Sequence, residues 1–279
     1  MKKVLFSSLC CNLAQALFFF AAYKQKRIGF TTFAMNKPQK QLTMSENYNI
    51  FKVLKFERKE TIHSAMIAAI ASHDSQSRDE FFKMLKKKKV ISAESPSRYL
   101  DKTFETEIDC LTHPDSIDFK SKRHWIDTEV NLSETVNREG KGRVSVNRGR
   151  ADIWIGTNKN VKEPYRLIIE NKINAGNQYH QLRRYYRYLT GNDRINAGLF
   201  FLCVKNCEYY KQQAQDSAKT FNSESGNNKD HLTEYAIITY EDDIIPWLVK
   251  VKENARGVFL KVVSDYHELV VSLVKNWNK

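Results

Sequence analysis

The stretches Gly149-Arg-Ala-Asp-Ile-Trp-Ile155 and Tyr165-Arg-Leu-Ile-Ile-Glu-Asn-Lys-Ile173 decide how this chain is expected to fold. Both are rich in the β-branched, aliphatic and aromatic residues that strands prefer, and a polar turn separates them. We therefore expect two neighbouring strands. They carry two carboxylates, Asp152 and Glu170, and one ammonium group, Lys172.

These three side chains are expected to lie on one face of a sheet. Side chains alternate between the faces of a strand, so Glu170 and Lys172 point the same way while Asn171 points away. If Asp152 faces that side, the two carboxylates can share a Mg2+ ion, with coordination positions left for water and a phosphate oxygen. Lys172 would orient or help to deprotonate the attacking water and stabilise charge on the phosphate.

An alternative interpretation is a salt-bridge ladder on the surface of a hairpin. Glu170 and Lys172 directly follow Leu167-Ile-Ile169, a run that indicates a buried strand. Unpaired charges in such a strand are costly. The residues therefore favour a metal site over a surface ladder.

The remaining chain predicts helices around a sheet. The expected elements, in chain order, are helical runs opening at Asn49, over Ile62–Ile70 and over Arg78–Lys89, loops with at most one short element over Pro96–Arg123, a strand over Trp125–Leu132, a flexible turn over Asn137–Asn147, strands over Arg150–Gly156 and Tyr165–Ile173, a helix over Gln178–Leu189, a strand over Ala197–Val204, a polar insertion over Lys211–Asp230, a strand over Glu234–Tyr240, and helices over Asp242–Val251 and Ala255–Asn276. This order predicts an α/β sandwich with a mixed sheet.

The segment Gly-Arg-Ala-Asp152-Ile, the strand leading into Glu170-Asn-Lys172-Ile and the Gln-rich helix that follows resemble the PD-(D/E)XK nuclease superfamily. The 17 residues between Asp152 and Glu170 suit a hairpin with one polar turn. Ala151 stands where the motif has proline. The resemblance implies a restriction-endonuclease-like α/β/α sandwich with a central mixed sheet and helical N- and C-terminal flanks, formed by a single domain over residues 46–279.

The resemblance also implies roles for the residues of the motif. Asp152 and Glu170 would bind Mg2+, for which Mn2+ could substitute, and the main-chain carbonyl of Asn171 would add a ligand. Lys172 would be catalytic. The expected substrate is DNA, although the residues do not separate DNA from RNA, nor endonuclease from exonuclease.

The next helix carries a Gln-x-x-x-Tyr element formed by Gln181 and Tyr185, which is similar to the RecB-type branch, where it helps to position metal-bound water or DNA. We expect Gln181 to assist catalysis. Gln178, Gln181, Tyr185 and Tyr188 fall at helical spacing and predict a polar, outward face. The expected nucleic-acid contacts are Gln178, Arg183, Arg184, Tyr185 and Arg187. A plain amphipathic helix with a solvated polar face is the alternative.

Upstream residues sometimes complete such a site. Glu129 lies on the strand expected beside Asp152, and we expect it to be a further metal ligand. Glu60 and His63 on an earlier helix are weaker candidates. For His63 the pattern of RecB-type enzymes has a glycine four residues earlier, where this chain has Lys59.

The formal charge of +13 would suggest a polyanionic partner, but seven of these charges lie in residues 1–40, which leaves +6 for the remainder. Residues 1–45 form a separate leader and linker with an apolar run after Met1-Lys-Lys. They are a signal-like segment, a membrane anchor, or the product of a start site assigned upstream of Met35 or Met44.

The cysteines predict no disulfide framework, because Cys110, Cys203 and Cys207 are an odd set outside the leader. Reduced thiols favour a cytoplasmic protein, with an anchored or exported one as the alternative if residues 1–34 are a targeting segment. A homodimer and a larger defence or repair assembly both remain open, and membrane association is not expected. The alternative function is a non-catalytic DNA-binding or partner-binding protein on the same scaffold.

Overall fold

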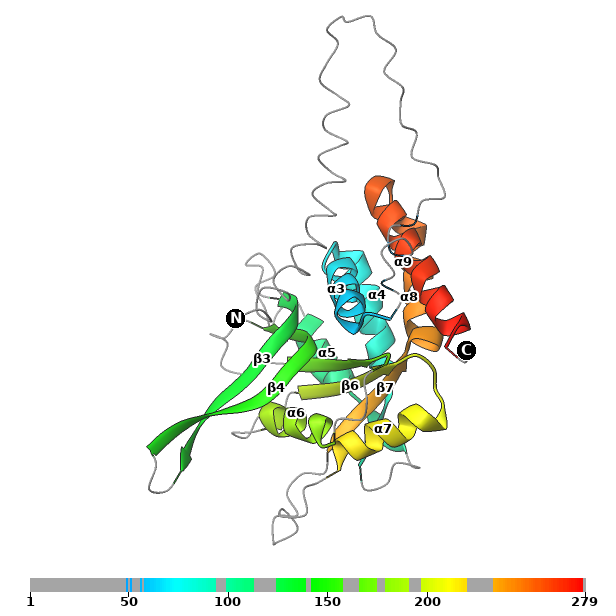
Figure 1. The fold of residues 1–279 in the computed structure, drawn as a ribbon. Helices are drawn as coiled ribbons and strands as arrows, with labels where there is room; N and C mark the ends of the chain where they lie inside the picture. The colour runs from blue at the N-terminus through cyan, green and yellow to red at the C-terminus, as the bar shows by residue number, and fades with distance from the viewer. Residues whose placement is uncertain are drawn as a thin grey trace, which may run out of the picture.

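The computed structural model describes most of the chain after residue 57 (Figure 1). The described residues are 49, 51, 56, 58–93, 99–112, 124–138, 142–157, 166–174, 179–190, 197–219 and 233–277. The expected leader over residues 1–45, most of the helical run opening at Asn49, and Gln178 therefore lie outside the described residues.

A seven-stranded mixed sheet forms the centre of the molecule, with the order β2-β1-β7-β6-β5-β4-β3. Its strands are β1 (Lys89–Ser92), β2 (Tyr99–Thr103), β3 (His124–Arg138), β4 (Gly142–Thr157), β5 (Arg166–Lys172), β6 (Ala197–Cys203) and β7 (Glu234–Thr239). β5, β6 and β7 run parallel, whereas the pairs β3–β4, β4–β5, β1–β7 and β1–β2 are antiparallel. The predicted mixed sheet is therefore confirmed.

Helices cover both faces of this sheet. They are α3 (Glu60–Ala71), α4 (Ser75–Lys86), α5 (Glu105–Thr112), α6 (Gln181–Thr190), α7 (Glu208–Ala218), the π-helical turn η3 (Tyr240–Ile244), α8 (Ile245–Asn254) and α9 (Gly257–Lys275). α3, α4, α8 and α9 lie on one side of the sheet, and α6 and α7 lie on the other (Figure 1). This arrangement is the α/β/α sandwich that the sequence predicts.

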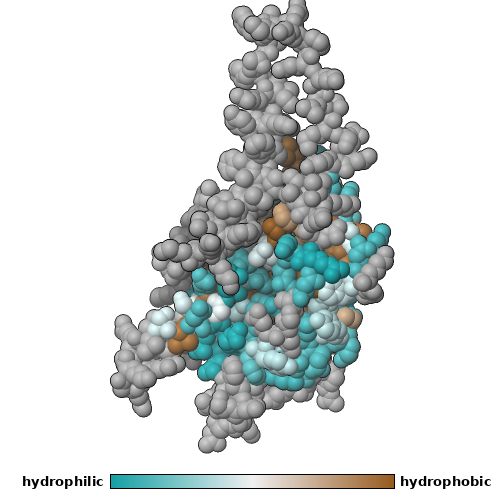
Figure 2. All heavy atoms as spheres, in the orientation of Figure 1, coloured by the Kyte–Doolittle hydropathy of each residue, from teal (hydrophilic) through white to brown (hydrophobic). Residues whose placement is uncertain are grey.

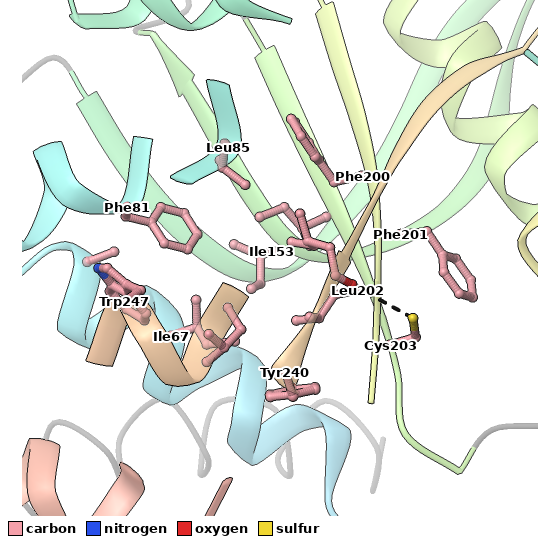
Figure 3. Packing of buried hydrophobic residues seen from close by; sticks show 14 of the residues in the cluster. Ile67, Phe81, Leu85, Ile153, Phe200, Phe201, Leu202, Cys203, Tyr240 and Trp247 are labelled. Carbon is pink, nitrogen blue, oxygen red and sulfur yellow. Dashed lines mark hydrogen bonds between the residues drawn. The ribbon is translucent and has the colours of Figure 1, made fainter. Parts of the chain in front are cut away.

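The central strand β6 shows why both faces must be covered. Its side chains alternate, so Phe200 and Leu202 point towards the layer that contains Phe81 and Trp247, while Phe201 points to the opposite side (Figure 3). All three β6 side chains are buried. A strand that is apolar on both faces is typical of a parallel sheet with helices on each side.

Local sequence signals explain where α4 and α8 begin. Asp74 precedes α4, and its carboxylate accepts a 2.7 Å hydrogen bond from the main-chain N–H of Ser77. This N-cap satisfies one of the donors that a helix leaves open at its start. Pro246 lies in the first turn of α8, where its missing N–H removes no helical hydrogen bond.

Three of the expected irregular segments are wrong. The expected flexible turn over Asn137–Asn147 is strand on both sides, since β3 continues to Arg138 and β4 begins at Gly142. The segment over Pro96–Arg123, expected to be loops with at most one short element, contains both β2 and α5. The expected polar insertion over Lys211–Asp230 begins inside α7, which extends to Ala218.

The described surface is mainly hydrophilic on the side shown in Figure 2, with small and separate hydrophobic areas. Among the described residues, no helix combines the length and the apolar composition that crossing a membrane requires.

Candidate active site

The three motif side chains of β5 alternate as expected. In the parallel ladder with β6, Glu170 lies beside Phe201 and Asn171 lies beside Leu202. Glu170 and Lys172 therefore lie on the α6 side of the sheet, and Asn171 lies on the α3 side. All three are at most 6% exposed. The end of β5 thus places one carboxylate, that of Glu170, and one ammonium group, that of Lys172, on the same face of the sheet.

Asp152 reaches this face from β4. The antiparallel register pairs Ile153 with Ile169, which places Asp152 beside Glu170. The Asp152 carboxylate accepts a 2.7 Å hydrogen bond at Oδ2 from the main-chain N–H of Asn171. The structure therefore brings Asp152 to the motif strand, as the sequence predicts.

Glu170 and Lys172 form a buried ion pair, with 2.5 Å between Nζ and Oε1. Neither carboxylate oxygen of Glu170 has a well-aligned hydrogen bond within the described residues, although Lys172 and Tyr185 both interact with this carboxylate. Buried polar atoms are normally satisfied, and exceptions often mark a bound ion or a catalytic role. The Glu170 carboxylate therefore has capacity for a further cationic partner.

Burial dominates the protonation of the two acids. It raises the pKa of Asp152 well above its usual value, and repulsion from Glu170 raises it further, whereas Lys172 and the Asn171 N–H oppose the rise. Burial also raises the pKa of Glu170, against the opposing effects of Lys172 and Tyr185. Two carboxylates forced together in this way gain from any cation placed between them.

The pKa of Lys172 is set by neighbouring charges rather than by burial. Burial alone would lower its pKa, but the carboxylates of Glu170 and Asp152 outweigh burial, and the net pKa is raised above the ordinary value. Lys172 is therefore an ammonium ion at neutral pH. It forms an ion pair with Glu170 and places positive charge beside the two acids.

Glu129 faces the same group of charges from β3. It falls opposite Asp152, between the pairs Thr128–Ile153 and Val130–Ala151, and has a positive φ of 58°. Its Oε2 lies 2.7 Å from Nε of Arg150 in an ion pair. Burial raises the pKa of Glu129, while Arg150 lowers it. Glu129 therefore lies close to Asp152, as the sequence predicts.

Helix α6 holds β4 in place just before Asp152. The Tyr185 hydroxyl donates a 2.6 Å hydrogen bond to the main-chain oxygen of Arg150, and Gln181 Nε2 donates to that hydroxyl at 2.7 Å. Gly149 has φ of +121°, and a Cβ added there would lie 3.0 Å from Cε1 of Tyr185. Glycine therefore allows β4 to approach α6 closely at this point.

The first turn of α3 fastens the far end of β5. Glu60 Oε1 accepts hydrogen bonds from the main-chain N–H groups of Ile173 at 2.7 Å and Asn174 at 2.9 Å. Asn171 Nδ2 donates to the main-chain oxygen of Glu60 at 3.1 Å and to Ser64 Oγ at 3.0 Å. We call these four hydrogen bonds the α3–β5 clamp.

The other side of Asn171 is also held. The Tyr240 hydroxyl at the start of η3 donates a 3.0 Å hydrogen bond to Asn171 Oδ1. The residue between Glu170 and Lys172 is therefore fixed through its amide oxygen, its amide nitrogen and its main-chain N–H. Sequence spacing could not reveal Tyr240 as a partner, because it lies 69 residues away.

A family model for the PD-(D/E)XK nuclease superfamily matches residues 48–268, which include every element from α3 to β7 and most of α9. The chain belongs to the PD-(D/E)XK nuclease superfamily. No curated protein and no solved structure matches it significantly.

Superfamily membership implies a divalent metal ion, and the acids present fit one. The Glu170 carboxylate is buried next to Asp152, and its oxygens lack well-aligned hydrogen bonds from described groups. A metal ion could therefore bind to it. Within the described ranges, no group of three or more His, Cys, Asp and Glu side chains is arranged to hold a metal ion. Water and substrate oxygens can complete the shell that Mg2+ requires.

The remaining candidate residues lie on α6 and differ in how far they are exposed to solvent. Gln181 and Tyr185 are buried against the sheet, so the expected outward polar face of this helix is wrong. Arg183 is 7% exposed and donates a 3.4 Å hydrogen bond to Thr233. Arg184 is half-buried, and Arg187 is exposed. The last two are the arginines of α6 that solvent reaches.

His63 lies apart from the superfamily motif. It is fully buried, its Nδ1 is 3.2 Å from the Tyr266 hydroxyl, and its ring packs edge-on against Tyr240 at 5.3 Å between centroids. These contacts put His63 in the core between α3 and α9. Its neighbour in sequence, Glu60, is the one that reaches the motif strand.

Proposed function

We propose that this chain is a Mg2+-dependent nuclease that hydrolyses phosphodiester bonds in DNA and belongs to the RecB-like branch of its superfamily. One observation carries the proposal. Asp152, Glu170 and Lys172 share one face of the sheet, and the Glu170 carboxylate is buried without a well-formed hydrogen bond from the described residues. Ionic groups buried in this manner are costly for stability and are typical of functional sites.

The proposed metal ligands are the carboxylates of Asp152 and Glu170 and the main-chain oxygen of Asn171, with Glu129 as a further ligand. A bound Mg2+ would supply Lewis acidity towards a phosphate oxygen and lower the pKa of a coordinated water molecule. Mn2+ would be accepted as well, because its preferred ligands are also carboxylate, carbonyl and water oxygens.

Lys172 has a separate role in the proposal. It acts as a cation that orients the attacking water and stabilises charge on the phosphate. Gln181 acts through Tyr185, whose hydroxyl holds the main chain two residues before Asp152. Arg184 and Arg187 on α6 contact phosphates of the substrate.

Cleavage of linear duplex, circular duplex and single-stranded DNA by the full chain, over a titration of Mg2+ and with a chelator, tests the proposal. Asp152→Asn and Lys172→Ala should each lower the cleavage rate by about a hundredfold or more. Matched controls are Asp265→Asn and Lys261→Ala, which alter a buried acid and an exposed lysine of an ion pair on α9. The controls should cleave at the wild-type rate.

Cleavage that survives both Asp152→Asn and Lys172→Ala would contradict the assignment. Salt-dependent DNA binding without cleavage in Mg2+ or Mn2+ would instead support the alternative of a non-catalytic binding protein. The same assay with RNA decides between the two nucleic acids.

A further inference from the structure

Arg150 is a charged residue of β4 that lies outside the motif residues already discussed. The register pairs it with Asn131 of β3, and it precedes Asp152 by two positions. Residues two apart on a strand share a face and lie about 7 Å from each other, so Arg150 starts on the face that carries the acids. Tyr185 fixes this starting point, because its hydroxyl donates a 2.6 Å hydrogen bond to the Arg150 main-chain oxygen. The base of the Arg150 side chain is thus held beside the candidate site.

Glu129 sets the direction of the Arg150 side chain. Its Oε2 lies 2.7 Å from Nε of Arg150. The two residues are diagonal neighbours on adjacent strands, a separation that long side chains can bridge. The Glu129 side chain is 10% exposed, and the Arg150 side chain is 50% exposed. The guanidinium group therefore lies at the boundary between the buried acids and solvent, where a substrate would arrive.

The backbone of Glu129 is unusual for a residue with a side chain. Its φ of 58° falls in the left-handed region, although the β3–β4 ladder keeps its register on both sides of it. Such outliers cluster at functional sites. An ion pair with a half-exposed member adds little stability, so the pair with Arg150 does not account for this backbone through stability alone. The geometry instead favours a function for the side chain that Glu129 directs.

The ion pair engages one nitrogen of the guanidinium group. Within the part of the chain that the structure describes, the acid paired with Arg150 is Glu129, and the pair is made through Nε. A guanidinium group presents its N–H groups as a planar fork that can bind two oxygens of a phosphate together. We propose that Arg150 binds two non-bridging oxygens of the scissile phosphate through its terminal nitrogens, while Nε stays on Glu129. The inference rests on the proposed function, because it assigns a substrate contact to the same site.

Arg150 also decides the sign of the charge that the site presents. The ionised acids Glu129, Asp152 and Glu170 carry −3, and Lys172 and Arg150 carry +2, so these side chains sum to −1. With a divalent cation on the acids, the total becomes +1 and attracts a phosphate. The same site without Arg150 is neutral. The arginine therefore supplies the charge that makes the loaded site favourable for an anion.

Other arginines near the motif strands are engaged in packing. Arg183 is 7% exposed. Arg166 lies over the ring of Trp154, with 5.6 Å from its guanidinium carbon to the ring centroid. Arg150 differs from both, because half of its side chain is exposed and it lies two positions from Asp152.

The salt dependence of DNA binding tests the contact separately from cleavage. The full chain is titrated with a DNA duplex of about 20 base pairs at several salt concentrations. Ca2+ replaces Mg2+, because it takes the same oxygen ligands, and a gel checks that the DNA stays intact. Each phosphate contact contributes about 0.9 to the slope of log affinity against log salt concentration, so Arg150→Ala should reduce the slope by about that amount. Arg150→Lys keeps a positive charge beside Glu129 and should retain the slope.

The matched control for binding is Lys102→Ala. Lys102 lies on β2, which forms the edge of the sheet opposite β3. Its side chain is 49% exposed, and its Nζ lies 2.5 Å from Oε2 of Glu234. It therefore resembles Arg150 in exposure and in pairing with an acid but lies far from the motif strands. Lys102→Ala should bind DNA with the wild-type slope.

Cleavage kinetics distinguish the scissile phosphate from a neighbouring one. At saturating DNA in Mg2+, loss of a group that touches the reacting phosphate should lower kcat, by about a hundredfold for Arg150→Ala and about tenfold for Arg150→Lys. The Mg2+ concentration for half-maximal cleavage should stay within about twofold of the wild type, because Arg150 binds the substrate and not the metal. Circular dichroism should show the wild-type fold in both variants.

A purely structural role, in which Arg150 only neutralises Glu129, predicts a different pattern. Arg150→Ala would then keep the wild-type salt slope and would change the Mg2+ requirement, because Glu129 is a proposed metal ligand. That pattern would overturn the inference. An equal loss of slope in Lys102→Ala would overturn it as well, and so would a reduced slope with an unchanged kcat.

Failure of the proposed function gives another pattern. A wild type that binds DNA with an Arg150-dependent slope but never cleaves would refute the nuclease, while Arg150 would still bind phosphate. Cleavage that depends on Asp152 and Lys172 but not on Arg150 would refute the contact and retain the nuclease. A wild type that binds neither DNA nor RNA would refute both.

Discussion

The carboxylate of Asp152 is held where ionisation is unfavourable. Its pKa is raised by burial and by Glu170, so the folded chain favours the protonated form, whereas the unfolded chain has the ordinary pKa of about 3.9. Stability from this group is thus complete below that value and is lost as pH rises through the higher folded pKa. Asparagine has no charge to lose and still offers an oxygen to the Asn171 N–H.

We expect Asp152→Asn to stabilise the metal-free protein by about 1 kcal/mol at neutral pH, as when an active-site compromise is relieved. The advantage should vanish below about pH 4, where the wild-type group is also neutral. Urea denaturation at several pH values in the presence of a chelator measures this. Asp265→Asn should show no such gain, and a variant that is less stable than the wild type at neutral pH would refute the argument.

Gly149 is the residue whose backbone and surroundings both exclude a side chain. Alanine there would adopt φ near +121° and would place its Cβ 3.0 Å from the Tyr185 ring. We expect Gly149→Ala to lower the free energy of unfolding by about 1–3 kcal/mol and to lower cleavage as well, since Tyr185 holds the strand that carries Asp152.

Gly257, at the start of α9, provides the control for Gly149. It too has a positive φ, of 56°, but lies on the C-terminal helix away from the motif strands. Gly257→Ala should therefore lower stability while the cleavage rate per folded molecule stays unchanged. Equal effects of the two substitutions on that rate would show that the contact of Gly149 with Tyr185 does not matter for the site.

At the scale of elements, the α3–β5 clamp suggests that Glu60 positions β5. A direct effect of its negative charge on the site is the alternative role. If Glu60 positions β5, an amide oxygen should replace its carboxylate, because the two main-chain N–H groups need only an acceptor. We expect Glu60→Gln to retain most of the activity and Glu60→Ala to lose about tenfold or more. Side-chain truncation leaves both N–H groups without this partner.

The measurement for Glu60 is the Mg2+ concentration that gives half-maximal cleavage, together with the maximal rate. A positioning residue should be rescued by glutamine in both quantities. If Glu60→Gln instead raises the required Mg2+ as strongly as Glu60→Ala does, the charge of Glu60 matters directly and the positioning role is wrong.

Elements with an apolar pattern were predictable from the sequence, and elements built from polar residues were not. β6 is a continuous apolar run and β5 contains the apolar run Leu167–Ile169, and the predicted bounds of both strands agree with the structure within one residue. α7 instead buries Tyr210 and Ala214 together with the polar Gln213 and Ser217, so its hydrophobic period is weak. Residues Asn137–Asn147, where β3 ends and β4 begins, were expected to be a turn because glycine and asparagine are typical of turns.

The candidate site likewise contains some residues that could be predicted from the sequence and others that could not. Asp152, Glu170 and Lys172 lie on adjacent strands, so spacing and alternation suffice to bring them together. Glu60 meets Ile173, which lies 113 positions later in the chain, a contact that no local pattern contains. The burial of Tyr185 was also missed, because a helix of arginines and tyrosines does not show which of its polar faces meets the sheet.

At the scale of the whole molecule, the buried acids make the fold sensitive to divalent metal. An ion that binds only the folded chain stabilises it, by about 2.7 kcal/mol at a free concentration one hundred times its dissociation constant. We expect Mg2+ to raise the Tm of the wild type and to leave the Tm of Asp152→Asn almost unchanged. Asp265→Asn should respond as the wild type does, and an equal response of all three proteins would indicate general ionic screening.

The α3–β5 clamp also bears on the order in which a newly made chain becomes competent. The motif strand is held by Glu60 on one side in sequence and by Tyr240 on the other, so its environment depends on contacts spanning 180 residues of synthesis. A nascent chain that ends at β5 already contains Glu60 but lacks Tyr240, which holds Asn171 from the other side. The geometry of the candidate site is therefore completed only when the chain has been made as far as Tyr240.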